Sequence, residues 1–454
     1  MIKKVLFLLM LLPLMVIFTT GGQAFANNPA KYETPIRVSL VPSINFNVTT
    51  TGPYKLLNVD NNKEVSYSGE LQFRHTPNQV TVRVNGRDFT SNRGFELIEQ
   101  ASSQEAYTTI TSVQHSGSFG VRDYRGSLKI QPGSSRLTLI NELDIEDYLL
   151  GVVPREMPAS WHQEALKAQA IAARNFAYNR SRSGNPITGT TLDQVYGGKT
   201  GEHANSTSAV RATRGIYALA NGRPIDAYFH SSSGGHTENS ENVWLNPLSY
   251  IRAVPDPYDR HPQNRNNAWT NVASRSDVER AVFGSGIQLV DLRVTSRTAA
   301  NSVQRVEATG INRSTGQIVT TTLPRAGETA DRLRGAFGTS PSLNSINFSV
   351  KKEDTSVRVK TANGSTQTVN YTYGNQVMLG NGSTERVNTQ QLIVRTANTT
   401  QQLPTSPSTY TFEGSGWGHR LGMSQWGARG MAEAGHTYEQ ILKHYYTGIT
   451  LGRL

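Results

Sequence analysis

A proline- and glycine-free stretch, Trp161–Arg182, most constrains the fold of this chain, because it predicts one long helix among segments patterned as strands. Its apolar residues recur at spacings of three or four, which places them on one helical stripe. The stripe consists of Leu166, Ala170, Ala173 and Ala177. Ser160 is the expected N-cap, with Gln163 completing a capping box. Gly184 is the expected stop signal.

Most of the other patterned segments alternate apolar and polar residues, as half-buried strands do. The Asn221-Gly222 turn predicts a hairpin between 216–220 and 224–230. Further expected elements are a short helix at 276–283, a strand pair at 288–296 and 302–310, and C-terminal helices at 423–434 and 437–445. We therefore expect an α+β fold: a β-rich core, a long helix after the loop around Glu156, and C-terminal helices. An all-β module precedes them.

The N-terminus has the features of a secretory signal peptide. Lys3 and Lys4 precede an apolar run at 5–18, and Ala24-Phe25-Ala26 fits a cleavage site. The alternative is that the segment stays as a membrane anchor. After this segment, 1–26, we expect a β-rich module over 27–114. A second domain over 115–454 would carry a β-rich insertion at about 351–409.

Composition excludes several kinds of chemistry. The 454 residues include no cysteine, so disulfides, thiol catalysis and cysteine-ligated zinc are excluded. Only 17% of the residues are charged, and the net charge is +11. No dense Lys/Arg run with interleaved aromatics is present, so nucleic acid is not an expected partner. For an exported protein, the expected anionic partner is the cell wall, to which it would bind peripherally.

Glu156 is the first candidate for catalysis. It stands between Gly151-Val-Val-Pro154 and Met157-Pro158, in what the prolines predict to be an apolar loop. Partial desolvation would raise the pKa of its carboxyl, which a general acid requires. The alternative is a surface glutamate in a turn. Lys167 and Arg174 share a helical face, where they would present cations to an anionic ligand or simply face solvent.

Two glycine-rich segments are also candidates. His230-Ser-Ser-Ser-Gly-Gly-His236 with Glu238 matches no standard zinc spacing, so a loop closing a cleft is favoured over a metal site. No G-x-S-x-G elbow accompanies its serines, which argues against a serine hydrolase. The segment 414–422 is not a phosphate-binding loop. Trp417 and His419 in this segment, with Trp426 shortly after it, suggest a surface for stacking sugar rings. The alternative is a tight turn that packs Trp417 into the core.

Three segments together resemble the stage II sporulation protein D / LytB (SpoIID/LytB) family of peptidoglycan-acting proteins. They are LDIEDYLLGVVPREMP (143–158) continuing through ALKAQAIAAR (165–174), AYFHSSSGG (227–235) with TENSENVW (237–244), and GWGHRLGMSQWGARGM (416–431) ending in ILKHYY (441–446). They occur in the family's order. The resemblance covers roughly 115–350 and 410–454.

The resemblance implies a lytic transglycosylase that acts on glycan strands stripped of stem peptides by a partner N-acetylmuramoyl-L-alanine amidase. Its catalytic residue would be Glu156. The substrate-binding residues it implies are Lys167, Gln169, Arg174, Tyr228, His230, Ser231, Gly418, His419, Ser424 and Gln425. LytB-type members imply an alternative, a non-catalytic wall-binding enhancer of an amidase autolysin. Some family members hold zinc with a histidine at position 230 and nearby cysteines; this chain lacks cysteine, so we expect no metal and no cofactor.

Overall fold

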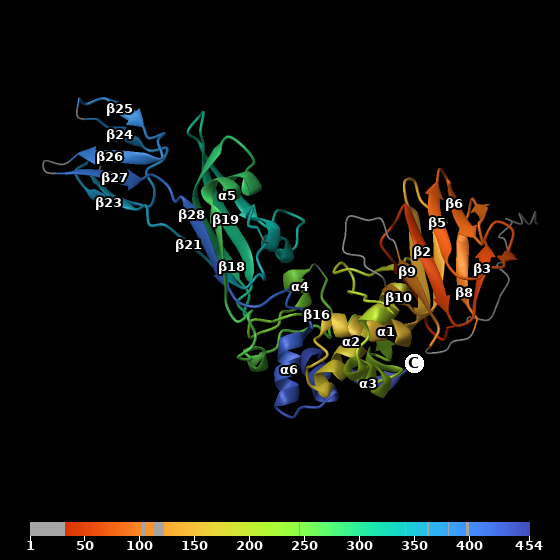
Figure 1. The fold of residues 1–454 in the computed structure, drawn as a ribbon. Helices are drawn as coiled ribbons and strands as arrows, with labels where there is room; N and C mark the ends of the chain where they lie inside the picture. The colour runs from red at the N-terminus through yellow and green to blue at the C-terminus, as the bar shows by residue number, and fades with distance from the viewer. Residues whose placement is uncertain are drawn as a thin grey trace, which may run out of the picture.

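A computed structural model describes residues 32–100, 105–111, 122–244, 246–340, 342–360, 363–379, 381–395 and 399–454. The predicted signal peptide, 1–26, lies outside these residues. The molecule is elongated: a β-sandwich stands at one end, helices fill the centre, and a β-rich arm leads to exposed hairpins at the other end (Figure 1). The α+β class and the N-terminal all-β region are as predicted. No helix among the described residues is both long enough and apolar enough to span a membrane.

The N-terminal sandwich consists of two sheets. One has the strand order β13-β1-β12-β11-β8-β3-β4, and the other β10-β9-β2-β5-β6-β7. Rings from both sheets meet in its core, where Phe73 lies 5.3 Å from Phe46 and 6.3 Å from Phe95. The strands are β1 (Pro35–Ser39), β2 (Asn45–Thr51), β3 (Tyr54–Asn58), β4 (Lys63–Val65), β5 (Leu71–Thr76), β6 (Gln79–Val84), β7 (Arg87–Ser91), β8 (Phe95–Glu99), β9 (Tyr107–Thr111), β10 (Arg122–Tyr124), β11 (Ser127–Pro132), β12 (Leu137–Asp144) and β13 (Ile187–Thr188).

The sandwich extends past residue 114, where the sequence placed a domain boundary. Strand β12 pairs with β1, and β11 pairs with β8, so strands from both sides of that position share one sheet. Alternate residues of β12 are buried, in agreement with its period-two pattern. The chain leaves β12 directly into helix α1, so the sandwich holds the start of that helix.

The helical centre is built around α2 (Gln163–Ser181), which contacts α1 (Ile145–Glu156), α3 (Ala204–Ala212), α6 (Gln425–Glu433) and α7 (Tyr438–Tyr445). The predicted apolar stripe on α2 is confirmed, since all four of its residues are fully buried. The expected start is wrong: His162 is the N-cap, and its Nδ1 accepts a hydrogen bond from Glu164 N at 3.2 Å. The prediction of a loop around Glu156 is also wrong, because these residues form the last turn of α1.

Two small sheets bring distant segments onto this centre. The predicted hairpin is present as β14 (Ile216–Ala220) and β15 (Arg223–Pro224), and β30 (Thr450–Arg453) pairs with β14. Strand β16 (Phe229–His230) runs parallel to β29 (Met423–Ser424). This pairing places residues 230–236, which we call the serine-glycine loop, next to the glycine-rich segment 414–422. The short helices are α4 (Ser240–Val243), η1 (Lys199–Gly201), η2 (Pro257–Asp259) and η3 (Ala330–Gly335).

The arm consists of two three-stranded sheets and one helix, followed by three hairpins. Its strands are β17 (Trp269–Ser274), β18 (Ile287–Arg297), β19 (Val303–Asn312), β20 (Ile318–Leu323), β21 (Phe348–Lys352) and β28 (Thr409–Gly414), with helix α5 (Arg275–Val282). The predicted short helix and strand pair are therefore present. The hairpins are β22 (Val357–Lys360) with β23 (Thr366–Val369), β24 (Gln376–Met378) with β25 (Thr384–Arg386), and β26 (Gln391–Arg395) with β27 (Thr400–Pro404).

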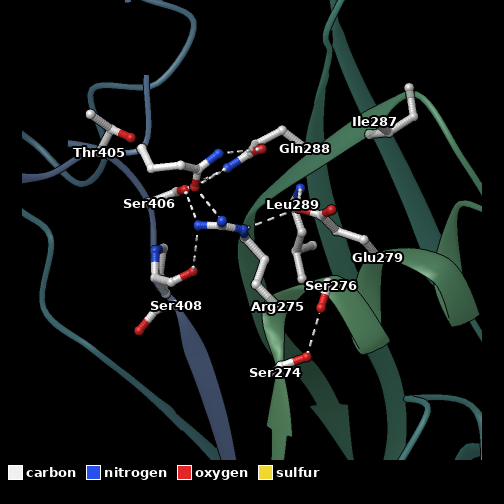
Figure 2. Close-up of polar contacts among 12 residues, drawn as sticks. Ser274, Arg275, Ser276, Glu279, Ile287, Gln288, Leu289, Thr405, Ser406 and Ser408 are labelled. Carbon is white, nitrogen blue, oxygen red and sulfur yellow. Dashed lines mark hydrogen bonds and ion pairs between the residues drawn. The ribbon is translucent and has the colours of Figure 1, made fainter. Parts of the chain in front are cut away.

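A polar cluster holds the returning chain to the arm (Figure 2). Arg275 Nη1 donates to Ser406 Oγ at 3.0 Å, and Gln288 Nε2 donates to the same oxygen at 2.9 Å. Glu279 accepts a hydrogen bond from Leu289 N at 2.9 Å and lies 3.3 Å from Arg275 Nε. These bonds fix the end of the hairpin region beside α5 and β18.

Candidate functional site

Glu156 is the last residue of α1, and its carboxyl is largely removed from water. Val195 N donates to Glu156 Oε1 at 2.7 Å. Burial raises the pKa of the Glu156 carboxyl, and the Val195 hydrogen bond offsets this only in part. The partial negative charge at a helix C-terminus also disfavours a carboxylate there. No cation among the described residues pairs with it, so the group favours its protonated form more than an ordinary glutamate does.

The segment that presents Val195 is itself fixed by buried polar contacts. Tyr148 Oη donates to Gln194 Oε1 at 3.2 Å, and Gln194 Nε2 donates to Ala173 O at 3.4 Å. Tyr148 and Gln194 are both fully buried. The hydrogen bond from Val195 N to the Glu156 carboxyl therefore comes from a rigid backbone group.

Two glutamines join the end of α1 to α2 and α6. Gln425 Nε2 donates to Glu156 O at 2.9 Å and to Gln169 Oε1 at 3.3 Å. Gln169 is fully buried, and its Nε2 has no hydrogen-bond partner among the described residues. The structure thus brings Glu156, Gln169 and Gln425 together from three helices.

Three predicted site residues form an aromatic cluster beside these glutamines. His419 lies 5.5 Å from His230 and 6.4 Å from Tyr228, measured between ring centroids. Trp244, which the sequence did not single out, lies 4.7 Å from Tyr228 and 5.1 Å from His419. His230 pairs with Ser424 in the β16–β29 ladder, and Gln425 follows in the chain, so the cluster and the glutamines are adjacent.

Both histidines of the cluster favour the neutral form. Burial lowers the pKa of His230 well below its usual value, and burial lowers that of His419 to about 4. His230 Nδ1 lies 3.1 Å from Leu421 O, and a carbonyl only accepts, so Nδ1 carries the proton. His230 Nε2 then carries a lone pair, and it is buried without a partner among the described residues. It is an available hydrogen-bond acceptor.

The remaining loop residues shape the site. Gly418 has φ +112°, and a Cβ there would lie 2.8 Å from the His230 Cβ, so only glycine fits. Ser424 caps α6 through a bond from Gly427 N at 3.1 Å. Ser231 O accepts from Trp426 N at 3.1 Å. Ser424 is fully buried, which makes it a positioning group.

Arg174 differs from expectation. Its side chain is completely buried, and Nε and Nη2 each donate to a carboxylate oxygen of Glu146 at 2.8 Å. It also donates to Ile216 O at 3.2 Å. Arg174 therefore neither faces solvent nor presents its charge to a ligand at the surface, because its guanidinium bonds to groups inside the protein.

Lys167 is partly exposed, and its Nζ donates to Glu164 Oε1 at 2.7 Å. The same Nζ lies 5.8 Å from the centre of the Tyr438 ring on α7. Among the described residues it forms no hydrogen bond or ion pair with Glu156, so the structure places it on the α2–α7 surface.

The sequence missed two buried carboxylates beneath the serine-glycine loop. Asp259 accepts hydrogen bonds from Ser232 Oγ, Ser233 N, Gly234 N and Ser424 Oγ, at 2.7–3.0 Å. Asp256 accepts from Ser233 Oγ at 2.8 Å, and burial next to Asp259 raises its pKa to about 7. The sequence signal that could have identified this pair is the closely spaced Asp-Pro-Tyr-Asp at 256–259.

The aromatic residues expected to bind sugar rings lie in two places. Trp426 lies 4.7 Å from Trp161, and the Arg429 guanidinium lies 5.1 and 5.0 Å from these two rings. Trp417 is 48% exposed, so the alternative that packed it into the core is wrong. An exposed tryptophan ring is a suitable surface for the apolar face of a sugar.

The possible metal ligands at 230–238 include Glu238, whose carboxylate is used in hydrogen bonds within the protein. The Glu238 carboxylate accepts from Asn242 Nδ2 at 2.8 Å and from Thr298 Oγ1 at 2.6 Å. Within the described ranges, no three His, Cys, Asp or Glu side chains gather as a metal site. The expectation of no metal requirement stays a prediction.

Comparisons with known proteins match the region just described. A family profile described as SpoIID, Stage II sporulation protein, matches residues 133–219, which include α1 and α2. The amidase enhancer of Bacillus subtilis (strain 168) is 33% identical over 312 residues, which are 67% of this chain and 40% of that protein. Stage II sporulation protein D of Bacillus amyloliquefaciens is 28% identical over 332 residues, 69% of this chain and 75% of that protein. An uncharacterized protein of Brachyspira hyodysenteriae is 28% identical over 437 residues, 94% of each chain.

Proposed function

This chain belongs to the SpoIID/LytB family, and on that premise we propose that it is a peptidoglycan lytic transglycosylase. Its substrate would be glycan strands from which an amidase has removed the stem peptides. It would act outside the cytoplasmic membrane, in cell-wall remodelling that includes sporulation. The observation that carries the proposal is the largely buried Glu156 carboxyl, whose pKa is raised and which pairs with no cation among the described residues.

One carboxyl group is enough for this reaction. Protonated Glu156 donates its proton to the glycosidic oxygen between N-acetylmuramic acid and N-acetylglucosamine, and the bond from muramic C1 to that oxygen breaks. The resulting carboxylate takes the proton of the muramic C6 hydroxyl, whose oxygen bonds to C1 and closes a 1,6-anhydro ring. Glu156 thereby serves first as acid and then as base. A hydrolase that uses water would normally need a second carboxylate.

The surroundings of Glu156 support this role. Gln169 and Gln425 are neutral, and both histidines nearby favour the neutral form, so Glu156 is the group suited to donate a proton near neutral pH. His230 Nε2 offers an acceptor to a sugar hydroxyl. The tryptophan and glycine-rich walls would limit water at C1, which favours the internal hydroxyl as nucleophile.

A second candidate function rests on the amidase enhancer of Bacillus subtilis, which is 33% identical to this chain where the two align. In that case the same surface binds the glycan without turnover and increases the activity of an amidase. The aligned part is only 40% of the amidase enhancer, so further parts of that protein have no counterpart in the alignment.

Product analysis separates the two functions. Purified protein is incubated with amidase-stripped glycan strands, and the ends of the products are identified by mass spectrometry. We expect 1,6-anhydro-muramic ends. Binding without any new ends, together with stimulation of an added amidase, would favour the enhancer and overturn the transglycosylase.

A further inference from the structure

A cavity of about 410 Å³ lies where the helical centre meets the arm, at the end of the serine-glycine loop that is far from Trp426. Its walls come from the loop at Gly234–His236, from the β18–β19 turn, and from the start of β21 and the end of β28. The family resemblance assigns no role to these arm residues. The cavity is therefore a feature that the proposed reaction has not used.

The cavity carries an excess of positive charge. Arg260 and Arg297 line it, and neither pairs with a carboxylate among the described residues. Arg297 is oriented by two main-chain acceptors, Asn301 O at 3.0 Å and Phe348 O at 2.6 Å. The one lining carboxylate, Glu413, is already paired with Lys351 at 2.6 Å. Cations in a hollow concentrate the electrostatic field on an anionic ligand.

A third arginine makes the back of the cavity rigid. Arg420 is fully buried with φ +68°, a conformation that a residue with a side chain seldom adopts. It donates to Ser233 O at 2.9 Å, His236 O at 2.7 Å and Ala300 O at 3.1 Å. These bonds tie the serine-glycine loop to the β18–β19 turn. Arg297 directly precedes the β18–β19 turn, and Arg260 follows Asp259, which accepts hydrogen bonds from Ser232, Ser233 and Gly234 of the same loop. Both arginines therefore stand on segments that buried polar side chains tie to this loop.

The serine-glycine loop leads from the surroundings of Glu156 to the cavity. Ser231 O bonds to Trp426 N, next to the Gln425 that contacts Glu156, while Gly235 lines the cavity. The extended chain from Ser231 to Gly235 spans at most about 14 Å. The exposed Trp417 lies between them, because its backbone pairs with Ser232 at 2.8 and 3.1 Å. A glycan of several sugars could cover this distance.

We propose that this cavity is a distal subsite in which Arg260 and Arg297 bind a lactyl carboxylate of the stripped glycan strand. The inference rests on the proposed function and names a specificity determinant for it. Removal of a stem peptide converts the lactyl amide of muramic acid into a carboxylate, so the cavity would recognise stripped strands by charge. It takes the role that the sequence assigned to Arg174, which the structure uses internally.

The test measures binding without turnover, in the full chain carrying Glu156→Gln. The probe is stripped glycan strands of defined length, with calorimetry as the readout. We expect Arg260→Gln or Arg297→Gln to weaken binding about fivefold and the double variant about twentyfold, as partly exposed charge pairs do. The matched control, Arg265→Gln, alters an exposed arginine that does not line the cavity and should stay within about twofold.

Three further experiments make the result specific. The charge-keeping double variant with lysine at both positions should recover most of the affinity, which excludes simple misfolding. Strands whose carboxyl groups are reduced to alcohols should bind the parent and the double glutamine variant equally. Loss of binding to poly(glycerol phosphate), with glycan binding unchanged, would assign the cavity to teichoic acid and overturn the proposal.

The outcomes also separate this inference from the proposed function. If the parent binds stripped strands and the double glutamine variant binds them as well, the subsite is wrong and the proposed function stands. If the parent does not bind stripped strands at all, the proposed function fails and the subsite fails with it.

Discussion

The two ends of helix α1 carry glutamates in opposite electrostatic situations. Near the N-terminus, Glu146 forms a two-pronged ion pair with the buried Arg174, and Gly215 N donates to it at 3.0 Å. At the C-terminus, the Glu156 carboxyl accepts one backbone hydrogen bond and pairs with no cation, as far as the described part of the chain extends. The helix dipole reinforces the difference, because it stabilises negative charge at the first end and destabilises it at the last.

The comparison teaches that burial alone does not decide what a carboxyl group does. Glu146 forms an ion pair with Arg174, and this pair joins α1 to α2. Burial raises the pKa of the Glu156 carboxyl, and no cation among the described residues pairs with it to offset that rise, so its proton becomes available for transfer. One helix thus separates a structural carboxylate from a candidate acid.

The largest expected effect is on turnover, at the Glu156 end. Glu156→Gln should reduce anhydro-product formation by about 10³–10⁴-fold, the upper range for one acid-base group. The amide oxygen can still accept from Val195 N, so circular dichroism and glycan binding should be unchanged. A variant that retains more than a tenth of the wild-type rate would show that Glu156 is not the acid.

The next effect is on stability, at the Glu146 end. Arg174→Met leaves the Glu146 carboxylate buried without its partner, so we expect a loss of about 3–5 kcal/mol in the free energy of unfolding. Urea denaturation measures it. The double variant with Glu146→Gln should recover part of this loss, since the unpaired charge is gone. A loss below about 1 kcal/mol in Arg174→Met would contradict the structural role.

A smaller effect tests the raised pKa of Glu156. Below the ordinary glutamate pKa of about 4.5, the folded and unfolded wild type are both protonated there. As the pH rises, the unfolded chain releases this proton first, so the wild type loses stability relative to Glu156→Gln. We therefore expect the variant to gain in relative stability between pH 4 and pH 7 in urea denaturation. A stability difference independent of pH would mean that the Glu156 pKa is not raised.

The smallest effect is expected at Lys167. Its pair with Glu164 lies at the surface, so Lys167→Gln should change the free energy of unfolding by less than about 1 kcal/mol. Kinetic measurements on Lys167→Gln separate two roles for this residue. If Lys167 binds the glycan, the substitution raises KM several-fold; if it only forms a surface ion pair, kcat and KM stay unchanged. We expect unchanged values, and a several-fold rise in KM would return Lys167 to the binding site.

Features set by local pattern were predictable, while those set by distant contacts were not. The buried stripe of α2 and the Asn221-Gly222 hairpin follow from spacing and turn chemistry. Helix α1 was missed because Gly151 and Pro154 disfavour helix. A Cβ at position 151 would lie 2.7 Å from Gly198 O, so packing requires that glycine.

The site was predictable only where the residues themselves carry the chemistry. Glu156 was found from its apolar neighbours, although its setting is a helix end rather than a loop. Arg174 was misplaced because its partner, Glu146, is 28 positions away in the chain. Asp259 was missed for the same reason, since it contacts Ser232 and Ser424.

The pH dependence of kcat/KM for anhydro-product formation tests the central claim most directly. If Glu156 must be protonated to act, kcat/KM should be level at low pH and fall tenfold per pH unit above a pKa higher than that of an ordinary glutamate. A kcat/KM that rises through this range, or the absence of anhydro product at every pH, would contradict the account.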